Sequence, residues 1–262
     1  MTGLRFALVG KRLGHSFSKK YFDSKFEMSG LDKYSYTLLE MPDLSNLTNI
    51  VSRCSLDGFN VTIPYKRDIL PLLDSLDPTA EDIGAVNTVA VCHTASGIAM
   101  RGYNTDAPAF EQTLRPLITH QHRKALVLGT GGAAQAVAWG LKKLNIDFVF
   151  VSRHPELHTL SIGYDTLLRL NRDDFDYQII INATPVGMFP DIDSTPWCRP
   201  DLLTSGHICY DLTYNPSPTR FLKEAAAHGA TIVGGLEMLH RQADLAFEIW
   251  THTSTSNSQS SK

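Results

Sequence analysis

The stretch "ALVLGTGGAAQAV", residues 125–137, decides the fold of the second half of the chain. Its first four residues are apolar and predict a short buried strand, and the small residues after the glycines predict a helix. Gly129, Gly131 and Ala134 give the pattern G-x-G-x-x-A between them, which is typical of a loop that binds a dinucleotide. Gly129 allows a tight turn, Gly131 lets the backbone approach a pyrophosphate, and Ala134 lets the helix pack closely on the sheet. We therefore predict a Rossmann-type unit whose helix N-terminus offers its N–H groups to phosphate.

The strand after this helix indicates which dinucleotide is bound. In units that bind NAD, this strand ends in an Asp or Glu that hydrogen-bonds the ribose 2′-hydroxyl. Here the strand ends in "FVFVSRHP", so that Ser152 and Arg153 stand where the acid would be. A guanidinium stays charged and matches phosphate with two parallel hydrogen bonds, and this favours NADP. The alternative is that Arg153 is a surface residue without a ligand.

Short apolar runs alternate with amphipathic helices over almost the whole chain. This βαβ rhythm predicts an α/β protein with two domains, whose N-terminal domain has a mainly parallel sheet with helices on both faces. A hairpin turn at residues 93–97 interrupts the rhythm, and a helix over residues 236–250 closes it. The expected elements of the first half are strands over 4–10, 34–40, 58–63 and 85–91, a helix that Ser18 can cap, and a helix through 44–54.

Composition excludes several classes of protein. The chain has 262 residues, of which 43% are hydrophobic and 19% charged, and its formal net charge is −3. There is no basic excess for nucleic acid and no apolar run near the ~20 residues of a membrane helix. The N-terminus lacks the pattern of a secretory signal, and the four cysteines fit no zinc spacing. We therefore expect a cytoplasmic protein without a metal, a nucleic-acid partner or a membrane partner.

Polar side chains gather at the predicted strand ends. In "GFNVTIPYK", residues 58–66, Pro64 ends a strand, and Lys66 follows at what we predict to be the first turn of a helix. Other groups of this kind are Ser16 and Ser18 in "GHSFS", Asn87 in "GAVNT", and Asn104 and Asp106 in "GYNTD". Ligands of open α/β sheets bind beyond the carboxyl ends of the strands, and these hydroxyls, amides and charges suit a small polyhydroxy acid. The alternatives are turn and cap chemistry for each cluster and a solvated surface lysine for Lys66.

Seven motifs taken together resemble one family. They are "HSFS", "GFNVTIPYK", "GAVNT", "GYNTD", "GTGGAA", "NATPVGM" and "GGLEMLHRQ", in this order between about Phe6 and about Trp250. The chain resembles the shikimate dehydrogenases, which implies reversible NADPH-dependent reduction of 3-dehydroshikimate to shikimate, a step toward chorismate and the aromatic amino acids. The resemblance also implies a discontinuous substrate domain over 1–105 and 238–262, an inserted NADP domain over 106–237, and an active site in the cleft between them.

The resemblance assigns a role to each matching residue. It implies catalysis by Lys66 with Asp106 as its partner, and carboxylate binding by Ser16 and Ser18. It implies further substrate contacts by Asn60, Thr62, Asn87, Tyr214 and Gln242. It implies cofactor contacts by Gly129, Thr130, Gly131, Gly132, Ala133, Ser152, Arg153, Leu212 and Gly235. Lys66 would stabilise the negative charge that hydride attack builds on a ketone oxygen and would donate the proton.

The chain departs from the family pattern at three places. Lys19 stands where Pro is usual, Lys11 and Arg12 replace Asn-Pro, and Ser152-Arg153-His154 replaces Asn-Arg-Thr. Two rival functions follow from the same residues. One is a quinate/shikimate dehydrogenase with relaxed cofactor use, against which Arg153 argues. The other is a non-catalytic NADP-binding sensor, which would not need Lys66 and Asp106. We expect a small-molecule substrate and a monomer or homodimer.

Overall fold

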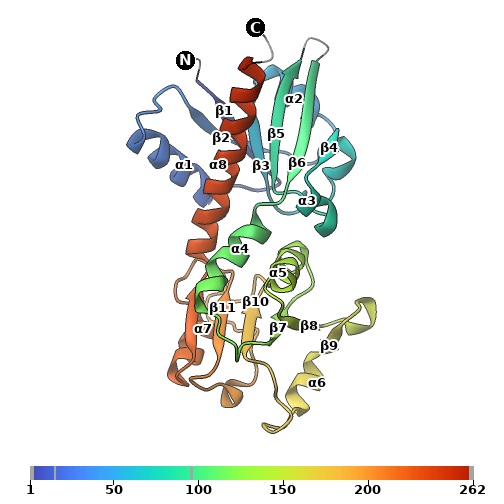
Figure 1. Cartoon of the computed structure of the whole chain (residues 1–262), viewed down its shortest axis with the longest axis vertical. Coiled ribbons are helices and arrows are strands. Elements are labelled where there is room, and N and C mark those ends of the chain that lie inside the picture. The colour runs from blue at the N-terminus through green and yellow to red at the C-terminus, as the bar shows by residue number, and fades with distance from the viewer. Residues whose placement is uncertain (1–2, 15, 95–96, 260–262) are drawn as a thin grey trace. The chain divides into compact units, whose positions relative to one another are not determined.

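The chain forms two compact units. The computed structural model describes residues 3–14, 16–94 and 97–259, with side chains described as far as residue 253. Unit 1 consists of Met1–Thr105 and His240–Lys262, and unit 2 consists of Asp106–Leu239. Unit 1 is therefore built from two segments that are far apart in the sequence, the blue-to-green and the red parts of the ribbon in Figure 1, and the residues of unit 2 come between these segments in the sequence.

Unit 1 is built on a six-stranded mixed sheet of strand order β2-β1-β3-β5-β6-β4. In the part of the chain that the structure describes, three of its pairings are parallel and two are antiparallel. The predicted hairpin is confirmed, because β5 and β6 pair in an antiparallel manner from Thr88 opposite Tyr103 to Thr94 opposite Gly97. The elements are β1 (Arg5–Gly10), α1 (Phe17–Met28), β2 (Ser35–Glu40), α2 (Leu47–Arg53), β3 (Gly58–Val61), β4 (Ser75–Leu76), α3 (Pro78–Ile83), β5 (Thr88–Thr94), β6 (Gly97–Tyr103) and most of α8 (Leu236–Gln259).

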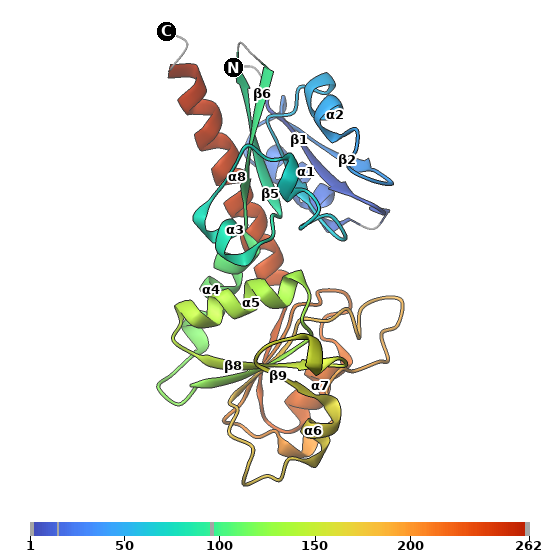
Figure 2. The same ribbon diagram turned by 90° about the vertical axis from the view of Figure 1, so that its right-hand side faces the viewer.

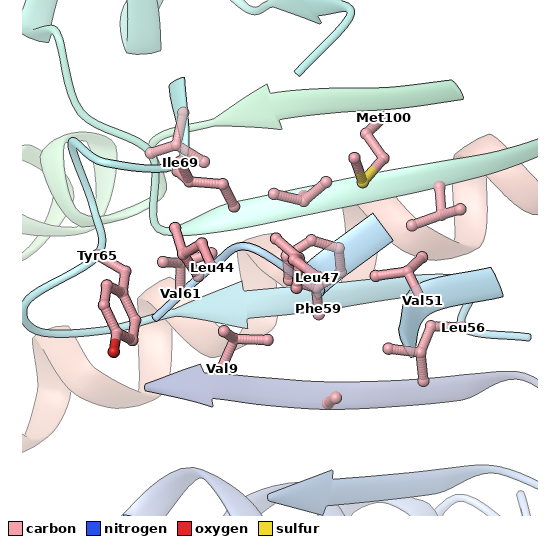
Figure 3. Close-up of a cluster of buried hydrophobic side chains, with 14 of the residues drawn as sticks. Val9, Leu44, Leu47, Val51, Leu56, Phe59, Val61, Tyr65, Ile69 and Met100 are labelled. Carbon is pink, nitrogen blue, oxygen red and sulfur yellow. The ribbon is translucent and has the colours of Figure 1, made fainter. Parts of the chain in front are cut away.

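Alternation along the strands gives this sheet two apolar faces. Ala7 and Val9 of β1 point to the face that α2 covers with Leu47 and Val51, and Figure 3 shows Val9, Leu47 and Val51 together in this cluster. The residue between them, Leu8, belongs to the opposite cluster, to which α1 and α8 contribute. Figure 2 shows α8 and α2 on opposite sides of the sheet.

Helix α8 completes the second of these clusters. The indole of Trp250 stacks on Phe6 with ring centroids 4.4 Å apart and an interplanar angle of 17°. Its Nε1 donates a hydrogen bond to the carbonyl oxygen of Val89 at 2.9 Å. Strand β3 passes so close that a Cβ at Gly58 would lie 2.2 Å from the indole, so glycine is required there. The core of unit 1 therefore depends on a residue from the end of the chain.

Unit 2 has the Rossmann-type fold that the sequence predicted. Its six strands follow the order β9-β8-β7-β10-β11-β12, and all five described pairings are parallel. Figure 2 shows α4 and α5 on one side of this sheet and α6 and α7 on the other. Its elements are α4 (Asp106–Leu114), β7 (Lys124–Leu128), α5 (Gly132–Lys143), β8 (Asp147–Ser152), β9 (Ser161–Gly163), α6 (Tyr164–Arg169), β10 (Ile179–Asn182), β11 (Ile208–Asp211), α7 (Arg220–Ala227) and β12 (Thr231–Gly234).

Two local predictions in unit 1 were wrong. Lys66 lies in a run of turns over residues 63–69 and not in a helix. Its carbonyl oxygen accepts a hydrogen bond from the backbone N–H of Val86 at 2.8 Å, so this carbonyl is not available to a helix. Ser18 does not cap α1, because α1 begins at Phe17 and Ser16 holds the N-cap position. The hydroxyl of Ser18 lies beside the phenol of Tyr36, whose pKa it lowers.

Candidate active site

The glycine loop after β7 has the shape that the sequence predicted. Gly129 has φ of 104°, which favours glycine, and a Cβ there would lie 2.9 Å from Cγ2 of Thr184. Gly131 is the N-cap residue of α5, and a Cβ added at Gly131 or Gly132 would meet nothing within 4 Å. The first N–H groups of the 12-residue helix α5 therefore adjoin open space, where a phosphate group could approach the backbone.

A pocket of about 700 Å³ lies beside this loop. It is lined by residues 129–131 after β7, residues 183–186 after β10 and residues 151–154 at the end of β8. The strand order reverses at β7, so the pocket lies at the switch point where open α/β sheets bind their ligands. Five of the residues predicted to bind the cofactor line it, namely Gly129, Thr130, Gly131, Ser152 and Arg153.

The charge of the pocket suits a phosphate group. Arg153, His154 and His158 line it, whereas its described lining residues include no Asp or Glu. The buried Ser152 accepts a hydrogen bond at Oγ from the backbone N–H of His154 at 3.0 Å, which fixes the turn after β8. Tyr164 and Cys198 also line the pocket. The sequence analysis missed these two side chains, because they come from α6 and a loop without a recognisable motif.

The other predicted cofactor residues lie elsewhere in unit 2. Gly132 and Ala133 begin α5. Leu212 and Gly235 follow β11 and β12, and a Cβ at Gly235 would lie 2.1 Å from the carbonyl oxygen of Leu212. Only glycine allows these two backbone segments to lie so close together. The structure thus brings Leu212 and Gly235 to each other at neighbouring strand ends.

A buried carboxylate organises the loop after β11. Asp211 is fully buried, and it accepts hydrogen bonds from Nδ2 of Asn182 at 2.9 Å, the N–H of Thr213 at 2.9 Å and Oγ1 of Thr219 at 2.7 Å. Burial raises the pKa of Asp211 although these donors lower it. The loop also carries Tyr214, whose pKa burial raises. Sequence reasoning missed Asp211, although an acid at a strand end was a signal that could have found it.

Unit 1 places Ser18, one of the two predicted serines, beside a buried polar network. Burial raises the pKa of the Tyr36 phenol, although its hydrogen bond with Ser18 lowers it. Oη of Tyr36 donates a hydrogen bond to Oδ1 of Asn60 at 2.8 Å. Oγ of Ser16 is buried and has no hydrogen-bond partner among the described residues. A buried hydroxyl without a partner is costly, so Ser16 is a candidate for ligand binding.

The network continues from Asn60 to Asn87. Nδ2 of Asn60 donates to the carbonyl oxygen of Asn87 at 3.2 Å and to Oγ1 of Thr88 at 3.0 Å. Oδ1 of Asn87 accepts from the N–H of Thr105 at 2.7 Å, and Nδ2 of Asn87 donates to Oγ1 of Thr105 at 2.9 Å. Asn60 has thus used both amide hydrogens inside the protein, whereas Asn87 uses one amide hydrogen within the described part of the chain.

Backbone hydrogen bonds hold the segment with Thr62 and Lys66 next to β1 and to the segment that carries Asn87. The N–H of Thr62 donates to the carbonyl oxygen of Val9 at 3.0 Å. The N–H of Val86 donates to the carbonyl oxygen of Lys66 at 2.8 Å. Because Val86 precedes Asn87, the segments that carry Thr62, Lys66 and Asn87 adjoin one another. The side chains of Thr62 and Lys66 are partly buried.

The remaining predicted residues divide between the units. Nδ2 of the buried Asn104 donates to the carbonyl oxygen of Ala85 at 3.0 Å. Asp106 is the first residue of α4 and of unit 2, to which Tyr214 also belongs. Gln242 lies on the part of α8 that belongs to unit 1. Across the described ranges, no cluster of three or more His, Cys, Asp or Glu could hold a metal ion. None of the described helices has the length and apolar character needed to cross a membrane.

Known proteins resemble this chain along almost its whole length. The family model described as "Shikimate dehydrogenase substrate binding domain" matches residues 8–89. The shikimate dehydrogenase (NADP(+)) of Caldicellulosiruptor saccharolyticus is 36% identical over 257 residues, which cover 93% of this chain and 90% of that protein.

Two solved structures extend this likeness to the fold. Shikimate 5-dehydrogenase from Thermus thermophilus, in complex with NADP(H) and shikimate, is 33% identical with a TM-score of 0.81, covering 95% of this chain and 94% of its own. Quinate dehydrogenase from Corynebacterium glutamicum, in complex with NAD, is 25% identical with a TM-score of 0.82, covering 98% of both chains.

Proposed function

Because the chain belongs to the shikimate dehydrogenase family, we propose that it catalyses the reversible NADPH-dependent reduction of 3-dehydroshikimate to shikimate. The observation that carries this proposal is the pocket of unit 2, where the glycine loop and Arg153 meet at the switch point of a parallel sheet. Its basic lining fits the 2′-phosphate that distinguishes NADP from NAD. The reaction would supply shikimate for chorismate and the aromatic amino acids.

The substrate is proposed to bind to the polar groups of unit 1, with one further contact from Tyr214 of unit 2. Ser16 and Ser18 hold its carboxylate, and the buried Oγ of Ser16, which no described residue hydrogen-bonds, supports this role. Its hydroxyls bond Thr62, Asn87, Gln242 and Tyr214. Asn60 has its amide hydrogens committed inside the protein, so we assign it to bracing Tyr36 and Asn87. This assignment revises the substrate contact that the sequence predicted for Asn60.

Lys66 supplies the acid–base chemistry in this proposal. NADPH, when bound, supplies the hydride that attacks the ketone carbon. The ammonium of Lys66 stabilises the negative charge that develops on the ketone oxygen and donates the proton that completes the alcohol. Asp106 orients this ammonium. In the reverse direction, neutral Lys66 takes the hydroxyl proton of shikimate. The segment of Lys66 suits this role because its backbone is tied next to Asn87.

An assay of four substrate and cofactor pairs tests the proposed function. The purified protein would be given shikimate or quinate with NADP or NAD, and reduction would be followed at the nicotinamide absorbance band. We expect shikimate with NADP to give the highest kcat/KM. Turnover of quinate with NAD that equals or exceeds turnover of shikimate with NADP would instead favour a quinate dehydrogenase. The likeness to the Corynebacterium enzyme is the reason for including this pair. NADP binding without turnover of either acid would favour the sensor.

The proposal includes the state and location of the protein. We propose that it acts in the cytoplasm as a monomer or homodimer. Light scattering should give the mass of one 29.0 kDa chain or twice that mass. Fractionation of the source cells should recover the activity with cytoplasmic marker enzymes, and activity that sediments with membranes would contradict the proposed location.

A further inference from the structure

Helices α1 and α8 meet in unit 1 along one stripe of each helix. The residues of α1 are spaced by four, and those of α8 by four and three, so each set lies on a single helix face. We define the α1–α8 seam as Phe17, Tyr21 and Lys25 of α1 with His240, Asp244 and Phe247 of α8.

The seam combines stacked rings with a polar centre. The ring of His240 stacks on Phe17 at 5.3 Å and on Tyr21 at 5.1 Å between centroids. One turn further, Oδ1 of Asp244 accepts a hydrogen bond from Oη of Tyr21 at 2.6 Å and contacts Nζ of Lys25 at 2.5 Å. The same ammonium lies 5.3 Å from the centroid of the Phe247 ring. A single carboxylate of α8 therefore holds two side chains of α1.

The charges of this centre are settled by its surroundings. Burial raises the pKa of Asp244, but the bonds from Lys25 and Tyr21 outweigh it, and the pKa is lowered. Burial and the bond to Asp244 raise the pKa of Tyr21, which therefore keeps its proton as a donor. The side chains of Lys25 and Asp244 are 26% and 31% exposed, so solvent screens this pair less than it screens a fully exposed pair. The seam is accordingly a specific contact between an ionised carboxylate and two donors.

The residues of the seam alternate in the sequence with residues that the proposed function uses. Phe17 stands between Ser16 and Ser18 at the start of α1. Gln242 stands between His240 and Asp244 on α8. At about 100° per residue, the side chain of Gln242 leaves the helix on the flank opposite to both. The core-facing Ala243, Ala246 and Trp250 set the side of α8 that meets the sheet. The seam ties α8 to α1 at this level, and so it sets the position of Gln242 relative to the two serines at the start of α1.

We infer that Asp244, held by Tyr21 and Lys25, is a positioning residue. It keeps Ser16 and Ser18 of the α1 end at the distance from Gln242 of α8 at which all three can contact one polyhydroxy acid. This inference rests on the proposed function, because it takes Ser16, Ser18 and Gln242 as the groups that bind the carboxylate and a hydroxyl of shikimate. Asp244 acts through these groups and does not touch the substrate.

The test compares Asp244→Asn with a matched control. Asn keeps the shape of the side chain but removes the charge that holds Lys25. The control is Asp23→Asn, which removes an ion pair of 2.8 Å between Asp23 and Lys19 within α1 itself. We expect Asp244→Asn to raise the KM for shikimate roughly three- to thirtyfold, with kcat and the KM for NADP near those of the wild type. The control should change none of these values. If the wild-type protein turns over shikimate and Asp244→Asn has the same KM for shikimate as the wild type, this inference is overturned and the proposed function stands. If the wild-type protein does not turn over shikimate, the proposed function is overturned.

A double-mutant cycle separates positioning from a merely structural role. If Asp244 acts by positioning Gln242, then Asp244→Asn should raise the KM much less in a Gln242→Ala background than in the wild type. Strictly multiplicative increases would mean that the two changes act independently, and this would overturn the inference. Melting curves of each variant report folding. If Asp244→Asn does not fold, Lys25→Met removes the same ion pair from the α1 side, and the same KM criterion applies to it.

Discussion

Among single residues, Arg153 gives the sharpest test of cofactor choice. Its guanidinium lines the pocket of unit 2 directly after β8, where the 2′-substituent of the adenosine ribose is expected. Arg153→Ala should weaken NADP binding about tenfold or more, because a charge-assisted hydrogen bond contributes about 1.5–3 kcal/mol. NAD has no 2′-phosphate, so its affinity should change little. Fluorescence titration of both cofactors measures this, with Arg169→Ala on α6, outside the pocket lining, as the control. Equal losses for the two cofactors would contradict the assignment.

Lys66 and Asp106 should behave as one catalytic pair. Lys66→Met keeps a similar volume without the charge, so NADP binding by unit 2 should survive. The rate of hydride transfer should fall about 10²–10⁴-fold, as is typical when a general acid is lost. Asp106→Asn should also slow transfer, and the double variant should lose less than the product of the single losses. Single-turnover absorbance measurements and shikimate titrations test this. Near-normal turnover by Lys66→Met would return Lys66 to the role of a solvated lysine.

The sequence identifies many site residues but not their partners. The sequence offers Ser18 as a cap or a ligand, but it does not show that the Ser18 hydroxyl lies beside the Tyr36 phenol. This pairing depends on the register of β2 against β1, which places the buried Tyr36 opposite Phe6. Asn60 looks like a substrate contact in the sequence, but its amide hydrogens are used by Asn87 and Thr88 of another strand region. Local pattern cannot predict such long-range pairings.

Among the elements, the loop between β11 and α7 depends on Asp211. Asp211→Ala should lower the free energy of unfolding by about 2–4 kcal/mol, because buried donors from Asn182, Thr213 and Thr219 lose their acceptor. Asp211→Asn should cost less than about 1 kcal/mol, since its Oδ1 can still accept two bonds and its amide can donate to the Thr219 hydroxyl. Chemical denaturation followed by circular dichroism compares the two. A loss in Asp211→Asn as large as in Asp211→Ala would mean that the charge itself is required.

Elements with a clear apolar run or period were predicted, and two short elements in a polar stretch were not. The strand and helix around the glycine loop follow the sequence closely, because an apolar run meets a run of small helix-forming residues there. Strand β9 and helix α6 have three and six residues, too few to show a period in a polar stretch. The turn at Lys66 was missed for another reason. It is fixed by a hydrogen bond from Val86, which is 20 residues away in the sequence.

At the scale of the whole molecule, Trp250 tests how the two chain segments of unit 1 hold together. Trp250→Ala should destabilise unit 1 by about 3–5 kcal/mol, because it removes a fully buried indole and leaves a cavity against Phe6. The control is Trp139→Ala on α5, whose indole is only partly buried. NADP affinity should persist, since the described lining of its pocket comes from residues 129–198 of unit 2. Denaturation with and without NADP separates the units, and similar losses in both variants would contradict this prediction.

The discontinuity of unit 1 is the part of the fold that pattern alone could not predict. Periodicity shows a final amphipathic helix but not which core it joins. The packing of α8 on unit 1 depends on two contacts. One is the space that Gly58 leaves for the indole of Trp250, and the other is the α1–α8 seam. The motif order, through its resemblance to a family, was the signal that supplied this expectation.

The late position of α8 has a consequence for synthesis on the ribosome. Chains emerge from their N-terminus, so Phe6, Phe22, Phe26 and Tyr36 leave the exit tunnel long before Trp250 does. During that interval, α2 can cover one face of the nascent sheet, but the other face has only α1 and still lacks α8. Such an apolar face is a binding site for chaperones and a starting point for aggregation. Unit 2 is continuous in the chain and can complete its core first. Messages truncated shortly before the codon for Trp250 should therefore yield polypeptides that keep an intact nucleotide fold attached to an aggregation-prone half.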